Sequence, residues 1–107
     1  MTNNLSTLIK ESKNIVIFTG AGISTESGIP DFRSPGGIWT KMKPIMFQDF
    51  ISSKSWQLES WKRKFEIDKN INIAKPNIGH NVIAKLNNKN KISYIITQNI
   101  DNLHQDS

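Results

Sequence analysis

An unbroken run of β-branched and aromatic residues at 15–19 (IVIFT) leads directly into the glycine turn Gly20-Ala21-Gly22. Such a run, without polar alternation, is typical of a parallel strand that is covered on both faces. A second run of this kind at 92–97 (ISYIIT) predicts another strand. Because helical patterns separate the two runs, the sequence predicts an α/β fold with a parallel sheet.

Helical patterns occupy most of the remaining chain. Thr2 or Asn3 is placed to cap a first helix. Trp56, Trp61 and Phe65 predict an apolar face on a later helix. The elements expected between the strands are, in order, a turn-rich stretch at 24–43, helices at 47–51 and 56–65, a loop at 68–75, and a helix that opens at Pro76 and ends at 87–90.

Composition bounds the class of protein. A chain of 107 residues has the usual size of a single domain. It contains no cysteine, which excludes a disulfide scaffold, a Cys-ligated zinc site and a Cys nucleophile within these residues. The longest apolar run, at 15–18, is too short to cross a bilayer, and the polar N-terminus carries no signal core. We therefore expect a cytoplasmic protein without a membrane partner.

The formal net charge of +5 raises the question of an acidic partner. The excess is regional, because residues 62–91 contain eight basic and two acidic side chains. Only two of the 14 basic residues, Arg33 and Arg63, are arginines, whereas nucleic-acid readers rely on arginine forks. A solvated basic face is the better interpretation, and nucleic-acid binding is not expected.

The glycine turn is a candidate phosphate site. Two glycines permit positive φ and let backbone amides approach a ligand, and a diphosphate at a following helix N-terminus is the natural occupant. The third glycine of a G-x-G-x-x-G fingerprint would fall at Thr25, so the dehydrogenase fingerprint fails. No Gly-Lys-Ser/Thr follows, so the P-loop fails as well. A simple tight turn between strand and helix remains the alternative.

Further motifs resolve this alternative. The segments Gly28-Ile29-Pro30-Asp31-Phe32-Arg33 and Thr97-Gln98-Asn99-Ile100-Asp101-Asn102-Leu103-His104 are similar, with the glycine turn, to three signature blocks of the sirtuins, which are NAD-dependent protein deacylases. The segment 74–80 (AKPNIGH) resembles the Lys-Pro-Asn-x-x-His helix start of that family. The four matches occur in order and span most of residues 14–107.

The resemblance implies a Rossmann-like NAD-binding domain and a set of cofactor-binding residues. The residues implied for the NAD diphosphate are Gly20, Ala21 and Gly22. Those implied for the nicotinamide end are Ser24, Ile29, Asn99 and Asp101, with Gln98 at the ribose hydroxyls. Those implied for the cofactor-binding loop are Asp31, Phe32 and Arg33, with Phe32 shielding the reacting ribose carbon and Arg33 facing the diphosphate.

The resemblance also implies that residues 1–107 lack the family's general base and zinc ligands. In sirtuins the general base is a histidine in a His-Gly pair, and four cysteines bind zinc; both would lie beyond Ser107. His80 and His104 resemble structural histidines of the family, so no catalytic or metal residue is expected in this chain. Residues 1–107 are thus expected to be the N-terminal portion of an incomplete parallel-sheet NAD-binding domain, with the cofactor-binding loop and part of the helical insertion, truncated before the base and the zinc module.

On the family's pattern, the complete enzyme transfers the acyl group of an acyl-lysine protein substrate to ADP-ribose and releases nicotinamide. We expect little or no deacylation by residues 1–107 alone. The segment Trp61-Lys62-Arg63-Lys64 does not reproduce the Tyr-x-x-Arg of sirtuins that prefer acidic acyl chains, so small uncharged acyl groups are expected. Two alternatives stay open: a non-catalytic module that binds NAD or ADP-ribose, and a sirtuin-type NAD hydrolase or ADP-ribosyltransferase.

Overall fold

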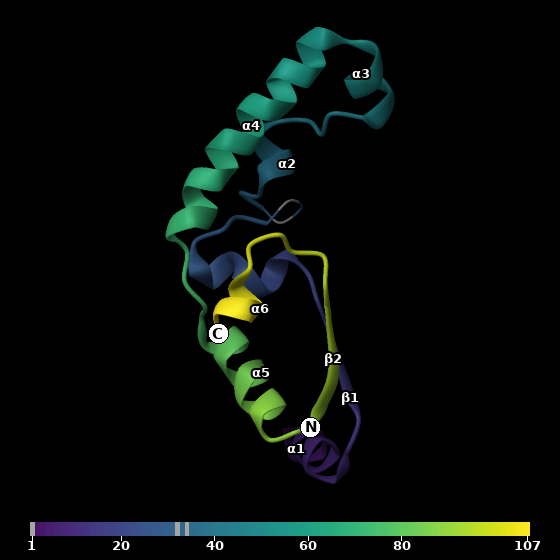
Figure 1. The fold of residues 1–107 in the computed structure, drawn as a ribbon, viewed down its shortest axis with the longest axis vertical. Coiled ribbons are helices and arrows are strands. Elements are labelled where there is room, and N and C mark those ends of the chain that lie inside the picture. The colour runs from purple at the N-terminus through teal and green to yellow at the C-terminus, as the bar shows by residue number, and fades with distance from the viewer. Residues whose placement is uncertain (1, 32, 34) are drawn as a thin grey trace.

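The computed structural model describes residues 2–31, 33 and 35–107. It begins with a helix, continues through a strand into a 3-10 helix, and returns to a second strand only after four helices (Figure 1). The elements are α1 (Thr2–Glu11), β1 (Ile15–Thr19), the 3-10 helix η1 (Ala21–Ser27), α2 (Ile38–Lys41), α3 (Phe47–Ser52), α4 (Lys54–Ile73), α5 (Ile78–Asn88), β2 (Ile92–Thr97) and α6 (Leu103–Asp106).

The two strands pair in parallel, as the sequence predicts. The register places Val16 beside Tyr94 and Phe18 beside Ile96, and a local irregularity lies between Ile15 and Val16. β1 ends at Thr19 and β2 ends at Thr97, and these two residues pair in the register. The carboxyl ends of the strands therefore lie at the same edge of the sheet. From there the chain enters η1 after β1 and turns back to α6 after β2 (Figure 1). The α/β class and the parallel pairing are confirmed.

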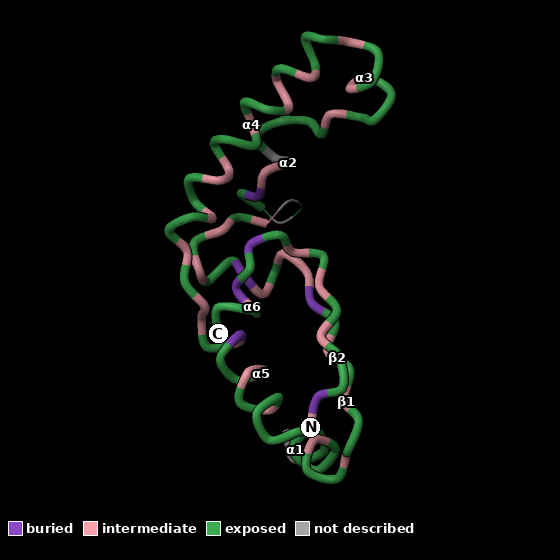
Figure 2. The backbone as a smooth tube through the Cα atoms, in the orientation of Figure 1, coloured by how far each residue is buried: buried purple, intermediate pink, exposed green. Residues whose placement is uncertain are grey.

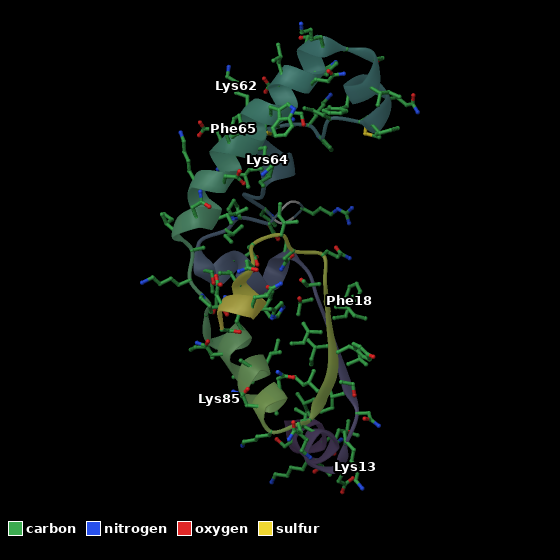
Figure 3. All side chains as sticks on the ribbon, in the orientation of Figure 1. Lys13, Phe18, Lys62, Lys64, Phe65 and Lys85 are labelled. Carbon is green, nitrogen blue, oxygen red and sulfur yellow. The ribbon has the colours of Figure 1, made fainter. Side chains whose placement is uncertain are left out.

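The prediction that these strands are covered on both faces is wrong for the described chain. Val16, Phe18, Tyr94 and Ile96 share one face and are 56%, 65%, 71% and 49% exposed. Phe18 lies on the side of the strands away from α5 (Figure 3). The physical reason is that α5 packs on one side of a two-stranded sheet, and no described helix covers the other side.

Helix α4 is longer than the pattern at 56–65 predicts, because it continues through the expected loop as far as Ile73. Ser53 caps it, since the Ser53 Oγ accepts a hydrogen bond from Trp56 N at 3.3 Å. Three ion pairs one turn apart support its helical path: Glu59 with Arg63, Lys64 with Asp68, and Glu66 with Lys69. The loop predicted at 68–75 is therefore wrong for residues 68–73, where these side-chain pairs and the helical spacing of Ile67 and Ile71 favour the helix.

The aromatic face predicted on this helix is present, but its side chains are largely exposed. The rings of Trp61 and Phe65 lie 6.0 Å apart between centroids. Trp56, Trp61 and Phe65 are all exposed. Figure 3 shows Phe65 projecting from α4 near Lys62 and Lys64.

Helix α5 begins at Ile78 rather than at Pro76, because Asn77 is its N-cap. Pro76 therefore precedes the cap instead of lying in the first turn. The helix ends at Asn88 within the predicted polar stretch, and Asn90 follows with a left-handed φ of 59°. At the other end of the chain, the side chains of Thr2 and Asn3, predicted as caps of α1, lie outside what the structure describes.

The molecule is extended, with principal dimensions of 53 × 27 × 25 Å. Its radius of gyration is 17.3 Å, whereas a compact chain of this length has about 13 Å. Helices α3 and α4 project away from the sheet (Figure 1). Within the parts of the chain that the structure describes, no helix has both the length and the hydrophobicity that a bilayer span requires.

Apart from Ile92 at the start of β2, the buried side chains gather near the carboxyl ends of the strands rather than in a broad apolar core (Figure 2). Among the described residues, the buried apolar side chains are Ile92 and Leu103. The buried polar ones are Thr19, Ser24, His80 and Asp101. Buried polar groups must be hydrogen-bonded to be tolerated, so this cluster is the natural place to look for a functional site.

Candidate cofactor-binding site

The glycine turn leads from β1 into η1 without left-handed backbone. Gly20, the N-cap of η1, is extended at φ −134° and ψ −167°, and Gly22 is also outside the positive-φ region. The positive φ that these two glycines permit is therefore not used in the turn; Gly28 has it instead, at φ 92° where η1 ends. A Cβ built at Gly20 or Gly22 would meet no described atom within 4 Å. Since neither backbone conformation nor packing among the described residues requires glycine, the space beside the turn suits a ligand that approaches the backbone closely.

The first turn of η1 presents backbone amides beside this space. The first helical hydrogen bond runs from Ile23 N to Gly20 O at 3.2 Å. The amides of Ala21 and Gly22 precede it, at the end of the helix where partial positive charge accumulates. Anionic groups are the ligands that such amides attract.

Ser24, in the middle of η1, is joined to the loop after β2. Its Oγ donates to Asp101 Oδ2 at 2.6 Å, although the two residues are 77 positions apart in the chain. Asp101 Oδ1 accepts from Leu103 N at 3.0 Å. Ser24 and Asp101 are both buried, so these hydrogen bonds to a carboxylate hold the two segments together in a region with little water.

Asn99 makes a second connection between the same segments. Its Nδ2 donates to Gly20 O at 2.8 Å and lies 3.5 Å from Ser24 Oγ. Its backbone N donates to Thr97 Oγ1 at 3.1 Å. Asn99 therefore fixes the start of the glycine turn relative to the end of β2.

His80 lies behind Ser24 and is fully buried. Its Nδ1 accepts a hydrogen bond from Asn77 N at 3.1 Å, completing a capping box at the start of α5. The remaining proton of a neutral ring is therefore on Nε2, which faces Ser24 Oγ at 3.5 Å. Burial lowers the pKa of His80, the neighbouring His104 lowers it further, and Asp101 opposes them. His80 is a hydrogen-bonded helix residue, as predicted, but sequence reasoning missed its contact with Ser24.

His104 contacts the end of β1 at Thr19, which in turn contacts the end of β2 at Thr97. Thr19 Oγ1 donates to Thr97 Oγ1 at 2.8 Å, so His104 Nε2, also 2.8 Å from Thr19 Oγ1, is the donor to that oxygen. The rings of His80 and His104 meet edge to face with centroids 5.2 Å apart. The structural role that the resemblance implies for His104 agrees with these contacts.

A cavity of about 220 Å³ lies between these groups and α4. Its polar wall is formed by Ser24, Gln98, Asn99 and Asp101. The rest of its lining is Ala21, Ile29, Pro30, Ile38, Ile67, Asn70, Ile71 and Ile100. An apolar cavity with a few converging polar groups is typical of a small-molecule site.

The cavity brings together a subset of the residues predicted from the sequence: Ala21, Ser24, Ile29, Gln98, Asn99 and Asp101. Gly20 joins them through its hydrogen bond with Asn99. Gly22, Asp31 and Arg33 are not in the lining, and Arg33 is exposed. Phe32 lies outside the described residues.

Helix α4 supplies lining residues that sequence reasoning missed. Ile67 and Ile71 face the cavity from a region of which part was expected to be a loop. Their i, i+4 spacing is the signal that could have identified both the helix and its inward face. Ile38, which also lines the cavity, begins α2. Its backbone N donates to Asp31 O at 2.8 Å and so fixes the start of α2 relative to Asp31.

Comparison with known proteins agrees with the family resemblance of the sequence motifs. A family model described as the Sir2 family matches residues 20–107. An NAD-dependent protein deacetylase from Bradyrhizobium diazoefficiens is 54% identical over 103 residues, which are 96% of this chain and 41% of that protein. An NAD-dependent protein deacetylase from Thermodesulfovibrio yellowstonii is 53% identical over 98 residues, covering 92% of this chain and 38% of that protein.

Solved structures agree with the fold. A Sir2 homologue variant in complex with ADP-ribose has a TM-score of 0.88 at 36% identity, covering 99% of this chain and 43% of that one. A Sir2 structure with a p53 peptide and NAD⁺ has a TM-score of 0.81 at 41% identity, covering 99% and 41%. The chain thus spans about 40% of the length of the proteins it matches. On the match of the family model, the sequence motifs and this fold, the chain belongs to the Sir2 family, the sirtuins.

Proposed function

We propose that this chain forms the cofactor-binding part of an NAD-dependent protein lysine deacylase of the deacetylase type. The observation that carries the proposal is the buried Ser24–Asp101 hydrogen bond, which lies in the wall of a cavity directly beside the glycine turn. The names of the curated relatives and the NAD and ADP-ribose complexes of the solved ones support this choice of cofactor.

The cavity fits one end of NAD rather than the whole molecule. Its volume of about 220 Å³ is below the roughly 300–1,000 Å³ of sites that enclose a complete ligand. A carboxamide offers both donors and an acceptor, and the adjacent Asp101 carboxylate and Asn99 amide offer the complementary groups. We therefore assign the nicotinamide end to this cavity, with the half-buried Ile29 and Ile71 in its apolar lining.

The glycine turn is assigned to the diphosphate. The absence of side chains at Gly20 and Gly22 leaves open space, and the first amides of η1 lie beside it. Gln98 is assigned to the ribose hydroxyls, and Asp31, Phe32 and Arg33 to the cofactor-binding loop. These residues bind and orient NAD, whose chemistry is to release nicotinamide and make the ribose carbon electrophilic toward an acyl-lysine carbonyl oxygen. We assign no general base to residues of this chain.

The test compares two ligands that differ at the nicotinamide end. NAD and ADP-ribose share the diphosphate, so isothermal titration calorimetry on the 107-residue chain separates the two parts of the site. Ser24→Ala removes the hydroxyl that donates to Asp101. We expect it to weaken NAD binding by about tenfold, or 1.4 kcal/mol, and to change ADP-ribose binding by less than about twofold.

Ser55→Ala, a change at an exposed serine of α4, is the matched control and is expected to leave both affinities unchanged. Absence of saturable NAD binding by the unsubstituted chain would contradict the proposal. So would an equal loss for both ligands in Ser24→Ala. Release of free nicotinamide by the chain itself would favour an NAD hydrolase instead.

A further inference from the structure

Asn77 connects two elements that carry different parts of the site. As N-cap of α5, its Oδ1 accepts from Gly79 N at 2.9 Å. Its Nδ2 donates in the opposite direction, to Ile23 O at 2.7 Å and to Ser27 Oγ at 2.9 Å. The orientation of the amide is fixed, because the Gly79 N–H can only donate and the Ile23 carbonyl can only accept.

The close approach of α5 to η1 is visible at a second residue. A Cβ built at Gly79 would lie 3.1 Å from Asn77 Oδ1 and 3.4 Å from Ile23 Cγ1. Glycine at this position therefore lets the first turn of α5 pack directly on Ile23. The packing and the Asn77 hydrogen bonds hold the same residue of η1.

Ile23 is a sensitive position at which to hold η1. Its carbonyl belongs to the peptide unit that joins it to Ser24, and a planar peptide moves as one body. A 3-10 helix has weak hydrogen-bond geometry of its own, so η1 depends on contacts with its neighbours. Fixing the Ile23 carbonyl orients Ser24, whose Oγ then meets Asp101 at 2.6 Å.

We propose that Asn77 is a positioning residue of the cofactor site, which holds η1 so that Ser24 and the glycine turn are oriented before the ligand binds. The inference rests on the proposed function in one respect, because cofactor affinity is one of its readouts. Asn77 carries out this role separately from its capping of α5, and the two roles use different atoms of one amide. That separation makes the proposal testable with a single isosteric change.

The variant is Asn77→Asp. It retains an oxygen that accepts from Gly79 N, and aspartate is as good an N-cap as asparagine. It replaces the donor with a second carboxylate oxygen, which cannot bond to Ile23 O and repels it. We expect the affinities for NAD and for ADP-ribose both to fall by about tenfold, because η1 carries the glycine turn as well as Ser24. Asn81→Asp, the same change at an exposed residue of α5, is the control and should leave both affinities unchanged.

Two further measurements, made without ligand, distinguish positioning from capping. Amide hydrogen exchange should accelerate in η1 and stay unchanged in α5 in Asn77→Asp. The ¹⁵N chemical shift of the Ser24 amide, which belongs to the same peptide unit as the Ile23 carbonyl, should move in this variant and not in Asn81→Asp. A loss of protection confined to α5, or unchanged affinities with an unchanged Ser24 shift, would overturn the proposal. If the unsubstituted chain fails to bind NAD, the proposed function fails, whereas the exchange and shift measurements still decide the role of Asn77.

Discussion

Hydrogen-bond direction around His80 follows from one backbone amide. Because Asn77 N donates to Nδ1, the neutral ring carries its proton on Nε2, toward Ser24 Oγ. Ser24 in turn donates to Asp101. In this series of hydrogen bonds, which runs from Asn77 through His80 and Ser24 to Asp101, each donor faces an acceptor. The series requires that the His80 imidazole be neutral.

Acidification should therefore destabilise the fold through His80. Its pKa in the folded state lies below its ordinary value of 6.5, chiefly because of burial, then because of His104, while Asp101 opposes the shift. The unfolded chain takes up the proton first, so the stabilisation present above about pH 6.5 is lost as the pH falls through the folded-state pKa. The protonated ring would also lose the Nδ1 acceptor of the capping box.

The measurement is the free energy of unfolding by urea at pH values from 7.5 to 5, for the unsubstituted chain and for His80→Gln. Glutamine is a regular partner in a capping box and does not titrate. We expect a weaker pH dependence in His80→Gln, with His104 present in both proteins. Parallel curves for the two proteins would show that His80 is not the titrating group responsible.

The carboxyl end of helix α1 is joined to the sheet through the side chain of Lys91 and through backbone and polar contacts. Lys91, directly before β2, donates from Nζ to Lys10 O at 2.7 Å and to Ser12 O at 3.2 Å. An ammonium group at the carboxyl end of a helix satisfies carbonyls that lack a helical partner and complements their partial negative charge. Ser93 Oγ adds a hydrogen bond to Asn14 Oδ1 at 3.2 Å.

Lys91→Met should loosen α1 selectively. It keeps much of the length of the side chain but removes the charge and the donors. We expect faster amide exchange in α1 and a loss of about 1 kcal/mol in the free energy of unfolding, since the bonds are partly exposed. Lys89→Met, a change at an exposed lysine just before it, serves as control. Equal exchange in α1 for the two variants would contradict the assignment.

Both strands could be predicted from the sequence at their observed bounds, since each is a continuous apolar run that ends at polar or glycine residues. The bounds of the helices were harder to predict from the sequence. The continuation of α4 to Ile73 is marked only by the spacing of Ile67 and Ile71 and by ion pairs between turns. The start of α5 depends on a capping box that involves Asn77 and His80, which apolar periodicity does not report.

At the scale of the whole molecule, the exposed sheet face is the most distinctive feature. Val16, Phe18, Tyr94 and Ile96 form a contiguous apolar surface across both strands. Together with the extended shape, this face predicts that the 107-residue chain binds hydrophobic probes and associates at high concentration.

Phe18→Lys should reduce both properties. The side chain is 65% exposed, so the substitution removes apolar surface at little cost in packing. We expect lower fluorescence of bound ANS and less concentration dependence in sedimentation velocity. Leu5→Lys introduces the same charge at a residue of α1 that is 60% exposed, outside the sheet face, and is the control. A similar change in both variants would indicate a general effect of charge rather than a specific role of the sheet face.

The sequence alone determined the α/β class, both strands and the motifs that place Ser24, Asn99 and Asp101 in the site, because these depend on local patterns. Tertiary structure decided which of them meet. It joined Ser24 to Asp101 across 77 positions and Asn77 to Ile23 across 54. It also placed Ile67 of α4 in the cavity and left one face of the sheet exposed. Such contacts depend on how separate elements pack, and the direction of a side-chain hydrogen bond is settled only when its partner is in place.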